Sequence, residues 1–168
     1  MSLKPAVDQN DHVQGTKTAT LEIVEFGDYQ CPYCGAAHPI LKEMMEEFGH
    51  QIKFVFRNFP LSEIHQFARP AAVTAEAAAT ENKFWEVHDA LFEQQSQLST
   101  NFLLQLAENF KVDIAQLKEN ETLQNKVDSD FESGMRSGVN GTPTFFINGV
   151  KFDGGAVDLY ALLKSESH

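Results

Sequence analysis

The alternation of hydrophobic and polar residues predicts a strand, a helix and a second strand near the N-terminus. In "TATLEIVEFGD" the apolar positions predict a buried strand that ends at Gly27-Asp28. A helix follows, since apolar residues recur on one face between Pro32, a suitable first helical residue, and Gly49. In "QIKFVFRNFP" apolar and polar side chains alternate, which indicates a strand. This βαβ order predicts parallel strands.

Residues 59–138 carry helical patterns and no convincing strand. "EIHQFARPAAVTAEAAATEN" is Ala-rich, with Pro70 expected to break or kink its helix. The other predicted helices are "KFWEVHDALFEQQ", "NFLLQLAENF", the short "DIAQLKEN", and a last helix whose stripe closes at Gly138. The faces expected to be buried are Phe84, Val87, His88, Leu91 and Phe92 in the first of these, and Leu123, Val127, Phe131 and Met135 in the last.

The C-terminal part returns to strand patterns. Residues 144–147 and 150–152 read as strands joined by Asn148-Gly149, a two-residue hairpin turn, and residues 156–164 as a terminal helix. The predicted order is βαβ, helical insert, ββα. We therefore expect an α/β domain built from residues 13–58 and 139–165, an inserted helical subdomain at 59–138, and a flexible lead at 1–12, with a short strand near Val13.

Charge and apolar content narrow the classes of partner. The chain of 168 residues has 13 basic and 24 acidic residues, a net charge of −11, which argues against nucleic acid and anionic membranes. No apolar run approaches a membrane span, and the N-terminus shows no signal core. As the chain stands we expect a cytoplasmic protein, or an extracytoplasmic one if a signal sequence was trimmed, existing as a monomer or homodimer.

The two cysteines, Cys31 and Cys34, stand in "FGDYQCPYC" where the first strand gives way to the helix. At a helix start, the Cys31 sulfur faces unpaired N–H groups and the positive end of the dipole. Its pKa should fall into the range of about 3.5–7.5 known for such motifs. Cys34 lies one turn further in, and should be the less exposed sulfur. An exposed attacking thiol and a buried resolving thiol predict thiol–disulfide exchange.

A metal site and a structural staple are the alternatives for this pair. Zinc needs four ligands, and although His38 follows Cys34 at a spacing that zinc modules use, the chain has no second cysteine pair. A disulfide closing so short a loop would stabilise little. We expect no metal and no cofactor, and we expect His38 to be a helix-surface or neck residue near the active site.

Two further positions fit redox chemistry. Glu25 precedes Cys31 on the first strand, and a carboxyl buried beneath Cys34 could accept its proton. A strand-edge Glu facing water is the other reading. Pro143, in "GTP" before a strand, is a candidate cis proline whose neighbouring backbone could pair with a substrate.

The element order, "FGDYQCPYC", "FVFRNFPL", "KFWEVHDALF" and "GTPTFFING" together resemble the thioredoxin fold with a helical insertion, as in the DsbA-like thiol–disulfide oxidoreductases. The resemblance implies that Cys31 is the nucleophile, that Cys34 resolves, and that Glu25 is the buried acid. It also implies a cis Pro143 preceded by Thr142, with Pro32, Tyr33, Thr142 and Pro143 contacting the substrate. The implied partners are protein or peptide thiols and disulfides, and an unidentified electron donor or acceptor.

Two other functions stay open at this point. A glutathione-linked enzyme, similar to glutaredoxins or glutathione transferases, would need cationic contacts, of which Arg57 and a few lysines are the obvious candidates. A non-enzymatic redox sensor or metal-binding module would leave Cys31 near its ordinary pKa of about 8.5. The direction of exchange is not fixed by the sequence.

Overall fold

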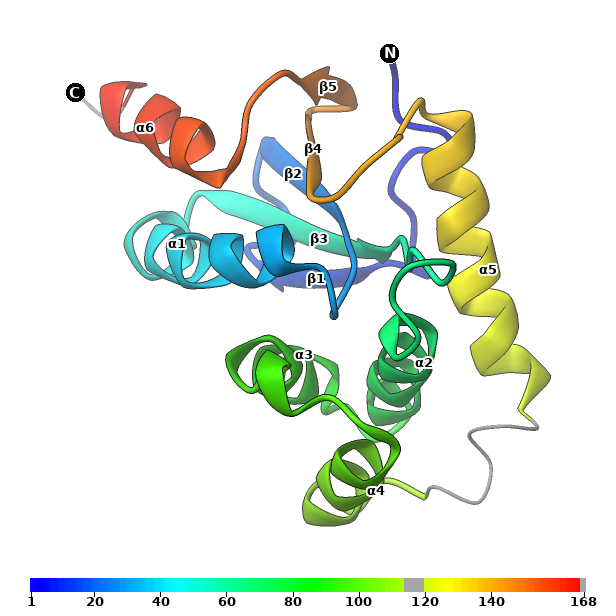
Figure 1. Ribbon diagram of the computed structural model, residues 1–168. Coiled ribbons are helices and arrows are strands. Elements are labelled where there is room, and N and C mark those ends of the chain that lie inside the picture. The colour runs from blue at the N-terminus through cyan, green and yellow to red at the C-terminus, as the bar shows by residue number, and fades with distance from the viewer. Residues whose placement is uncertain (114–119, 167–168) are drawn as a thin grey trace.

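The computed structural model describes residues 1–113 and 120–166 and contains a central five-stranded sheet with helices around it (Figure 1). The strands are β1 (His12–Gly15), β2 (Leu21–Gly27), β3 (Ile52–Asn58), β4 (Thr144–Ile147) and β5 (Val150–Phe152). The helices are α1 (Pro32–Phe48), α2 (Ala68–Ala79), α3 (Phe84–Glu93), α4 (Thr100–Asn109), α5 (Glu121–Arg136) and α6 (Ala156–Glu166), with a 3₁₀ turn η1 (Gln95–Gln97). None of the helices described has the length and apolar character of a membrane span.

The strand order is β1-β3-β2-β4-β5. Strands β2 and β3 are parallel, which confirms the predicted βαβ unit, while β1, β4 and β5 pair antiparallel to their neighbours. The expected short strand near Val13 is β1. Asn148 and Gly149 have φ of 49° and 82°, the left-handed backbone of a two-residue hairpin turn, as predicted.

Successive residues of β2 point to opposite faces of the sheet, and each face has its own apolar core. Ile23 lies in the core beneath α1 and α6, with Leu41, Met44 and Leu159. Val24 lies in the core of the other face, on the side of α5. Figure 1 shows α1 and α6 on one side of the sheet and α5 on the other, with α2, α3 and α4 grouped below.

A third apolar cluster is built mainly from α2, α3 and α4, and it continues to Tyr29, both cysteines and Phe56 of β3. The five α3 residues expected on its buried face are all buried. Pro70 was expected to break or kink this helix, and it does neither. It is the third residue of α2, where the N–H has no helical partner to lose. The short helix expected in "DIAQLKEN" falls largely on 114–119, outside the described residues.

The apolar stripe predicted along α5 is wrong at its end. Leu123 and Val127 are buried, whereas Met135 is 60% exposed. Residues four apart on a helix advance by about 40° beyond a full turn, since each residue turns about 100°. Over three steps the stripe therefore leaves the core, and Ser133 and Gly134 take the buried positions.

The first residues, expected to form a flexible lead, make defined contacts with the rest of the domain. Leu3 is buried, and the backbone of Ser2 bridges to Val150. The N–H of Lys4 donates to Ser137 Oγ at 2.8 Å. These contacts place the segment beside the end of α5 and the β4–β5 turn, so it is packed where a loose lead was expected.

Candidate active site

The loop from β2 into α1 positions the cysteine pair. Cys31 is the N-cap of α1 in extended backbone, Pro32 is the first helical residue, and Cys34 lies one turn in. Both side chains are buried, at 4% exposure for Cys31 and 0% for Cys34. The expectation of an exposed attacking sulfur is therefore wrong for this free-dithiol state, because both cysteines join the apolar cluster that continues into the helical insert.

The surroundings of Cys31 favour its thiolate. A hydrogen bond from the Cys34 thiol lowers the pKa of Cys31 to about 5, although burial opposes this. Thr142 and the backbone N–H groups of Cys34 and Tyr33 lower it further. The N–H groups are those left unpaired at a helix start, as the sequence predicts. With a pKa of about 5, the Cys31 side chain is largely a thiolate at neutral pH.

The surroundings of Cys34 have the opposite effect. Its hydrogen bond to Cys31 raises the pKa of Cys34, and burial and the negative charge of Glu25 raise it further. The backbone N–H of Asp28 lies 3.5 Å from the Cys34 sulfur and partly offsets this. The pair thus has one thiolate and one protonated thiol, which is the asymmetry that stepwise exchange requires.

Glu25 is buried on β2, at 1% exposure, and does not face open water. It shares the face of β2 that carries Ile23, beneath α1. Burial raises the pKa of Glu25 to about 8, so the carboxyl is largely protonated at neutral pH. Glu25 lines a cavity of about 170 Å³ together with Leu41 and Met45 of α1. A carboxyl with this pKa can exchange protons near neutral pH.

The loop before β4 approaches the cysteines. The Thr142–Pro143 peptide bond is cis, which confirms that prediction, and the Cys31 sulfur, which can donate only when protonated, lies 3.7 Å from the Thr142 carbonyl oxygen. The Thr142 hydroxyl is buried and has no hydrogen-bond partner in the described structure. It is therefore available to a thiolate. Pro32 and Tyr33, between the two cysteines in the sequence, are exposed, Tyr33 at 76%.

Two residues beside the cysteines were missed in the sequence. Asp28 is buried and accepts hydrogen bonds from the N–H groups of Gln30 and Leu61, at 2.7 and 3.0 Å, which hold the loop ahead of Cys31. Gln95 reaches from η1 to the carbonyls of Tyr29 and Cys31. "GDYQC" offers Asp28 as a turn residue, whereas nothing local marks Gln95, which lies over sixty residues away.

His38 lies elsewhere than expected. It is buried, at 6% exposure, and its Nε2 lies 3.1 Å from the carboxylate of Glu93 on α3. The contact joins α1 to the insert, so His38 is not a surface residue of the helix. Its imidazole is engaged by carboxylates of the insert.

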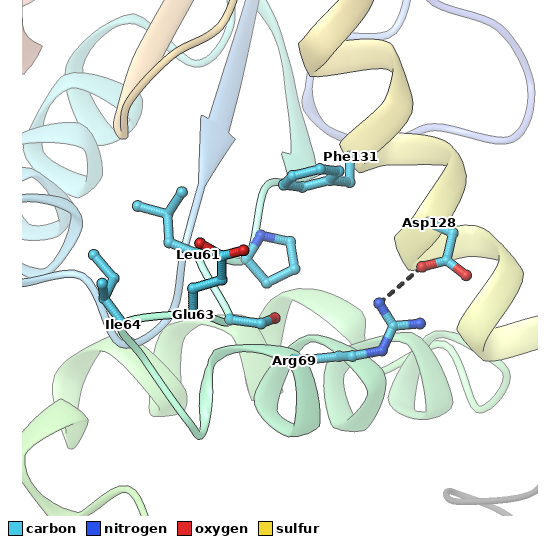
Figure 2. Close-up of a pocket in the computed structure, with 8 residues that line it drawn as sticks. Leu61, Glu63, Ile64, Arg69, Asp128 and Phe131 are labelled. Carbon is cyan, nitrogen blue, oxygen red and sulfur yellow. Dashed lines mark ion pairs between the residues drawn. The ribbon is translucent and has the colours of Figure 1, made fainter.

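A separate apolar hollow of about 530 Å³ lies between the loop after β3 and α5 (Figure 2). Figure 2 shows Leu61, Glu63 and Ile64 on the loop, with Phe131 of α5 opposite them. Arg69 and Asp128 form an ion pair of 2.8 Å across it. Neither cysteine nor Pro143 lines this hollow, so it lies beside the loop that Asp28 holds and not over the sulfurs.

The chain matches one family model and is similar to several solved structures. The family model described as Thioredoxin matches residues 7–163. BdbD from Bacillus subtilis, in its oxidised form, superposes with a TM-score of 0.81 at 28% identity, covering 99% of this chain and 96% of BdbD. The thiol-disulfide exchange protein alpha-DsbA2 from Wolbachia pipientis superposes with a TM-score of 0.79 at 24% identity, covering 94% and 86%.

Sequence relatives include the Na(+)/H(+) antiporter NhaA 1 of Salinispora arenicola, which is 38% identical over 153 residues. That match covers 89% of this chain and 23% of the antiporter. The antiporter NhaA of Nitrosospira multiformis is 34% identical, with 25% of its length covered. The chain thus spans about a quarter of the curated relatives it matches. With the family model covering nearly all of it, the chain belongs to the thioredoxin family.

Proposed function

We propose that this protein is a thiol–disulfide oxidoreductase that exchanges disulfides with protein substrates through Cys31 and Cys34. The observation that carries the proposal is the asymmetry of the pair. The pKa of Cys31 is lowered to about 5 at the start of α1, while that of Cys34, one helical turn away, is raised. A redox-inert binding module would have no reason to separate the two thiols in this way.

The exchange proceeds in two displacements. The Cys31 thiolate attacks one sulfur of a substrate disulfide, forming a mixed disulfide and releasing the other substrate sulfur as a thiolate. Cys34 then loses its proton and attacks the Cys31 sulfur. This step closes the Cys31–Cys34 disulfide and releases the second substrate thiolate, so two electrons pass from the protein to the substrate. Run in reverse, the same steps oxidise a substrate dithiol.

Glu25 is proposed as the acceptor of the Cys34 proton in the second displacement, in those molecules whose Glu25 carboxyl is ionised, a minority at neutral pH that grows as the pH approaches 8. Cys34 is a poor nucleophile while protonated, and the negative charge of Glu25 raises its pKa. When a proton passes to Glu25, that charge is removed at the moment the sulfur becomes anionic. The pKa of about 8 for Glu25 lies close enough to neutrality for the proton to be returned to solvent.

The substrate contacts proposed are Pro32, Tyr33, Thr142 and Pro143. Tyr33 is exposed beside Cys31, and the backbone of Thr142 already contacts the Cys31 sulfur. An extended substrate segment that pairs with the backbone before Pro143 would bring its own cysteine to this position, in the manner of strand addition. Such recognition reads backbone more than side chains, which suits an enzyme with many protein substrates.

Cysteine variants test the proposal. Cys31→Ser should abolish reduction of a disulfide-bonded protein substrate, and Cys34→Ala should accumulate mixed disulfides, visible by non-reducing electrophoresis and mass spectrometry. Full activity of Cys31→Ser would refute the proposed chemistry. Turnover of a glutathionylated peptide, in preference to a protein disulfide, would favour the glutathione-linked alternative.

The direction of exchange follows from the reduction potential of the pair. A potential of about −120 to −180 mV in glutathione buffers identifies an oxidant, of the kind that works outside the cytosol, and about −230 to −270 mV a reductant of the cytosolic kind. The pKa of about 5 for Cys31 lies between the values of about 3.5 and 7 typical of these two kinds.

A further inference from the structure

Imidazole and carboxylate groups from two helices converge at the cavity that Glu25 also lines. His38 comes from α1, and His88 and Asp89 come from α3. One potential ligand atom from each of the three lies within 4.8 Å of the others. Glu93, one turn beyond Asp89, places Oε2 3.1 Å from His38 Nε2, while Asp89 Oδ1 lies at 3.8 Å from the same nitrogen.

His88 is held in a fixed orientation. It is 4% exposed, and its Nδ1 lies 2.9 Å from the Tyr29 hydroxyl, which leaves Nε2 as the second ring nitrogen. His38, His88 and Asp89 line the same cavity of about 170 Å³ that Glu25 lines. An imidazole that is oriented by a hydrogen bond on one nitrogen and adjacent to a cavity has the features of a metal ligand.

We propose that His38, His88 and Asp89, with Glu93 as a fourth ligand, bind a divalent transition metal of the zinc class. Two imidazoles and carboxylate oxygens suit Zn²⁺ or Co²⁺ better than Mg²⁺ or Ca²⁺, which prefer oxygen alone. With metal–ligand bonds of about 2.0–2.2 Å, tetrahedral ligand atoms lie about 3.3–3.6 Å apart. The distances of 3.1 and 3.8 Å around His38 Nε2 bracket this spacing, and the ligand atoms of His38, His88 and Asp89 lie within 4.8 Å of one another.

Lys42 is the cation that competes for these carboxylates. Its Nζ lies 3.4 Å from Asp89 and 3.1 Å from Glu93, and its side chain is 45% exposed. A long, exposed side chain can move its ammonium into water when a dication arrives. Removing the ammonium should therefore tighten metal binding.

The site would fasten the two parts of the chain to each other. His38 belongs to the helix that carries the cysteines, whereas the other ligands belong to the helical insert. A metal that binds only the folded chain stabilises it in proportion to its affinity and concentration. We expect metal-dependent thermal stabilisation of the docked insert, independent of any disulfide exchange.

The test uses the full chain with Cys31→Ser and Cys34→Ser, so that no thiolate can hold the metal and the result does not depend on exchange activity. Titration with Co²⁺, followed by its visible ligand-field absorbance and by Zn²⁺ competition, should show saturable binding of one ion. Asp89→Asn and His38→Gln should weaken binding by at least about tenfold. Glu86→Gln removes one negative charge from an exposed position on the same helix, and it should leave metal binding unchanged. Lys42→Met should tighten metal binding.

If a histidine variant unfolds, Asp89→Asn still tests the proposal. Asp89 is 26% exposed and the amide has the shape of the carboxylate, so this variant should fold. Binding that does not saturate, or that weakens equally in Asp89→Asn and Glu86→Gln, would show only adventitious metal on an acidic surface. Either result overturns the proposal. A Lys42→Met variant that binds no more tightly than its parent would count against the assigned ligands.

Discussion

The side-chain amide of Gln95 donates to the backbone carbonyl of Cys31 at 2.8 Å. The same Nε2 lies 2.9 Å from the Tyr29 carbonyl. Gln95 belongs to η1 of the helical insert, and Cys31 caps the first helix of the other part of the chain. The insert therefore fixes the backbone of the turn that presents the reactive sulfur, so its docking bears on the chemistry as well as on stability.

Replacing Gln95 should loosen that turn. In Gln95→Ala the Tyr29 carbonyl loses this donor and the Cys31 carbonyl keeps only the Gly35 N–H, so we expect the free energy of unfolding to fall by about 1–3 kcal/mol. Urea denaturation of the oxidised protein measures the loss. Gln97→Ala, an exposed change in the same 3₁₀ turn, is the matched control and should be nearly neutral. Equal stability of the two variants would show that the Gln95 contact contributes nothing.

Gly35 has no side chain and so leaves space for Gln95. The substitution Gly35→Ala should therefore have opposite effects on stability in the parent and in Gln95→Ala. A Cβ on Gly35 would clash with Gln95 Oε1, and the nearest atoms around it all belong to Gln95. Gly35→Ala should therefore destabilise the parent protein. In the Gln95→Ala background the same change should stabilise by up to about 1 kcal/mol, because Ala is the better helix former. A double-mutant cycle by denaturation checks this, and simple additivity would contradict it.

The acidity of Cys31 should depend mainly on a donor at position 34. The hydrogen bond from Cys34 is the largest cause that lowers the pKa of Cys31 to about 5. We expect Cys34→Ala to raise this pKa, and Cys34→Ser, which keeps a hydroxyl donor, to raise it less. The thiolate absorbance of each variant against pH measures both values. An unchanged pKa in Cys34→Ala would assign the acidity to the helix start instead.

The Thr142 hydroxyl should matter to the thiolate and not to the resting fold. It is buried without a partner, yet Thr142 lowers the pKa of Cys31. Thr142→Val should therefore leave the oxidised protein equally stable or slightly more stable, and should raise the pKa of Cys31 in the reduced protein. Thr142→Ser keeps the hydroxyl and should behave as the parent does. A destabilised oxidised Thr142→Val would mean that the hydroxyl has a structural role.

The parts of the molecule that depend on local pattern could be predicted from the sequence. The buried face of α3, the hairpin turn at Asn148-Gly149 and the cap position of Cys31 all follow from neighbouring residues. The contacts of Gln95 with Cys31 and of His38 with Glu93 join residues 64 and 55 positions apart. They depend on how the insert docks, which no local periodicity encodes. The same docking buries Cys31, whose sulfur the sequence alone predicts to be exposed.

Glu25→Gln should change how stability depends on pH. Burial raises the pKa of Glu25 from 4.5 to about 8, so the folded protein holds a proton that the unfolded chain releases above 4.5. The stability contributed by the protonated carboxyl is fully present below pH 4.5 and is lost as pH rises through 8. Gln cannot ionise, so the variant should gain stability relative to the parent across this interval, by on the order of 4 kcal/mol at its end.

Denaturation of the oxidised forms between pH 4 and 9 measures the difference without interference from the thiols. Glu22→Gln is the control, because it removes a carboxylate from the same strand whose side chain is 24% exposed. Its stability should change with pH as that of the parent does. If Glu25 also takes the Cys34 proton, Glu25→Gln should slow release of the mixed disulfide while leaving its formation by Cys31 unchanged, because only the second step deprotonates Cys34. A variant that gains stability with pH but releases substrate at the parental rate would separate the two roles, leaving Glu25 a buried acid without a part in the exchange.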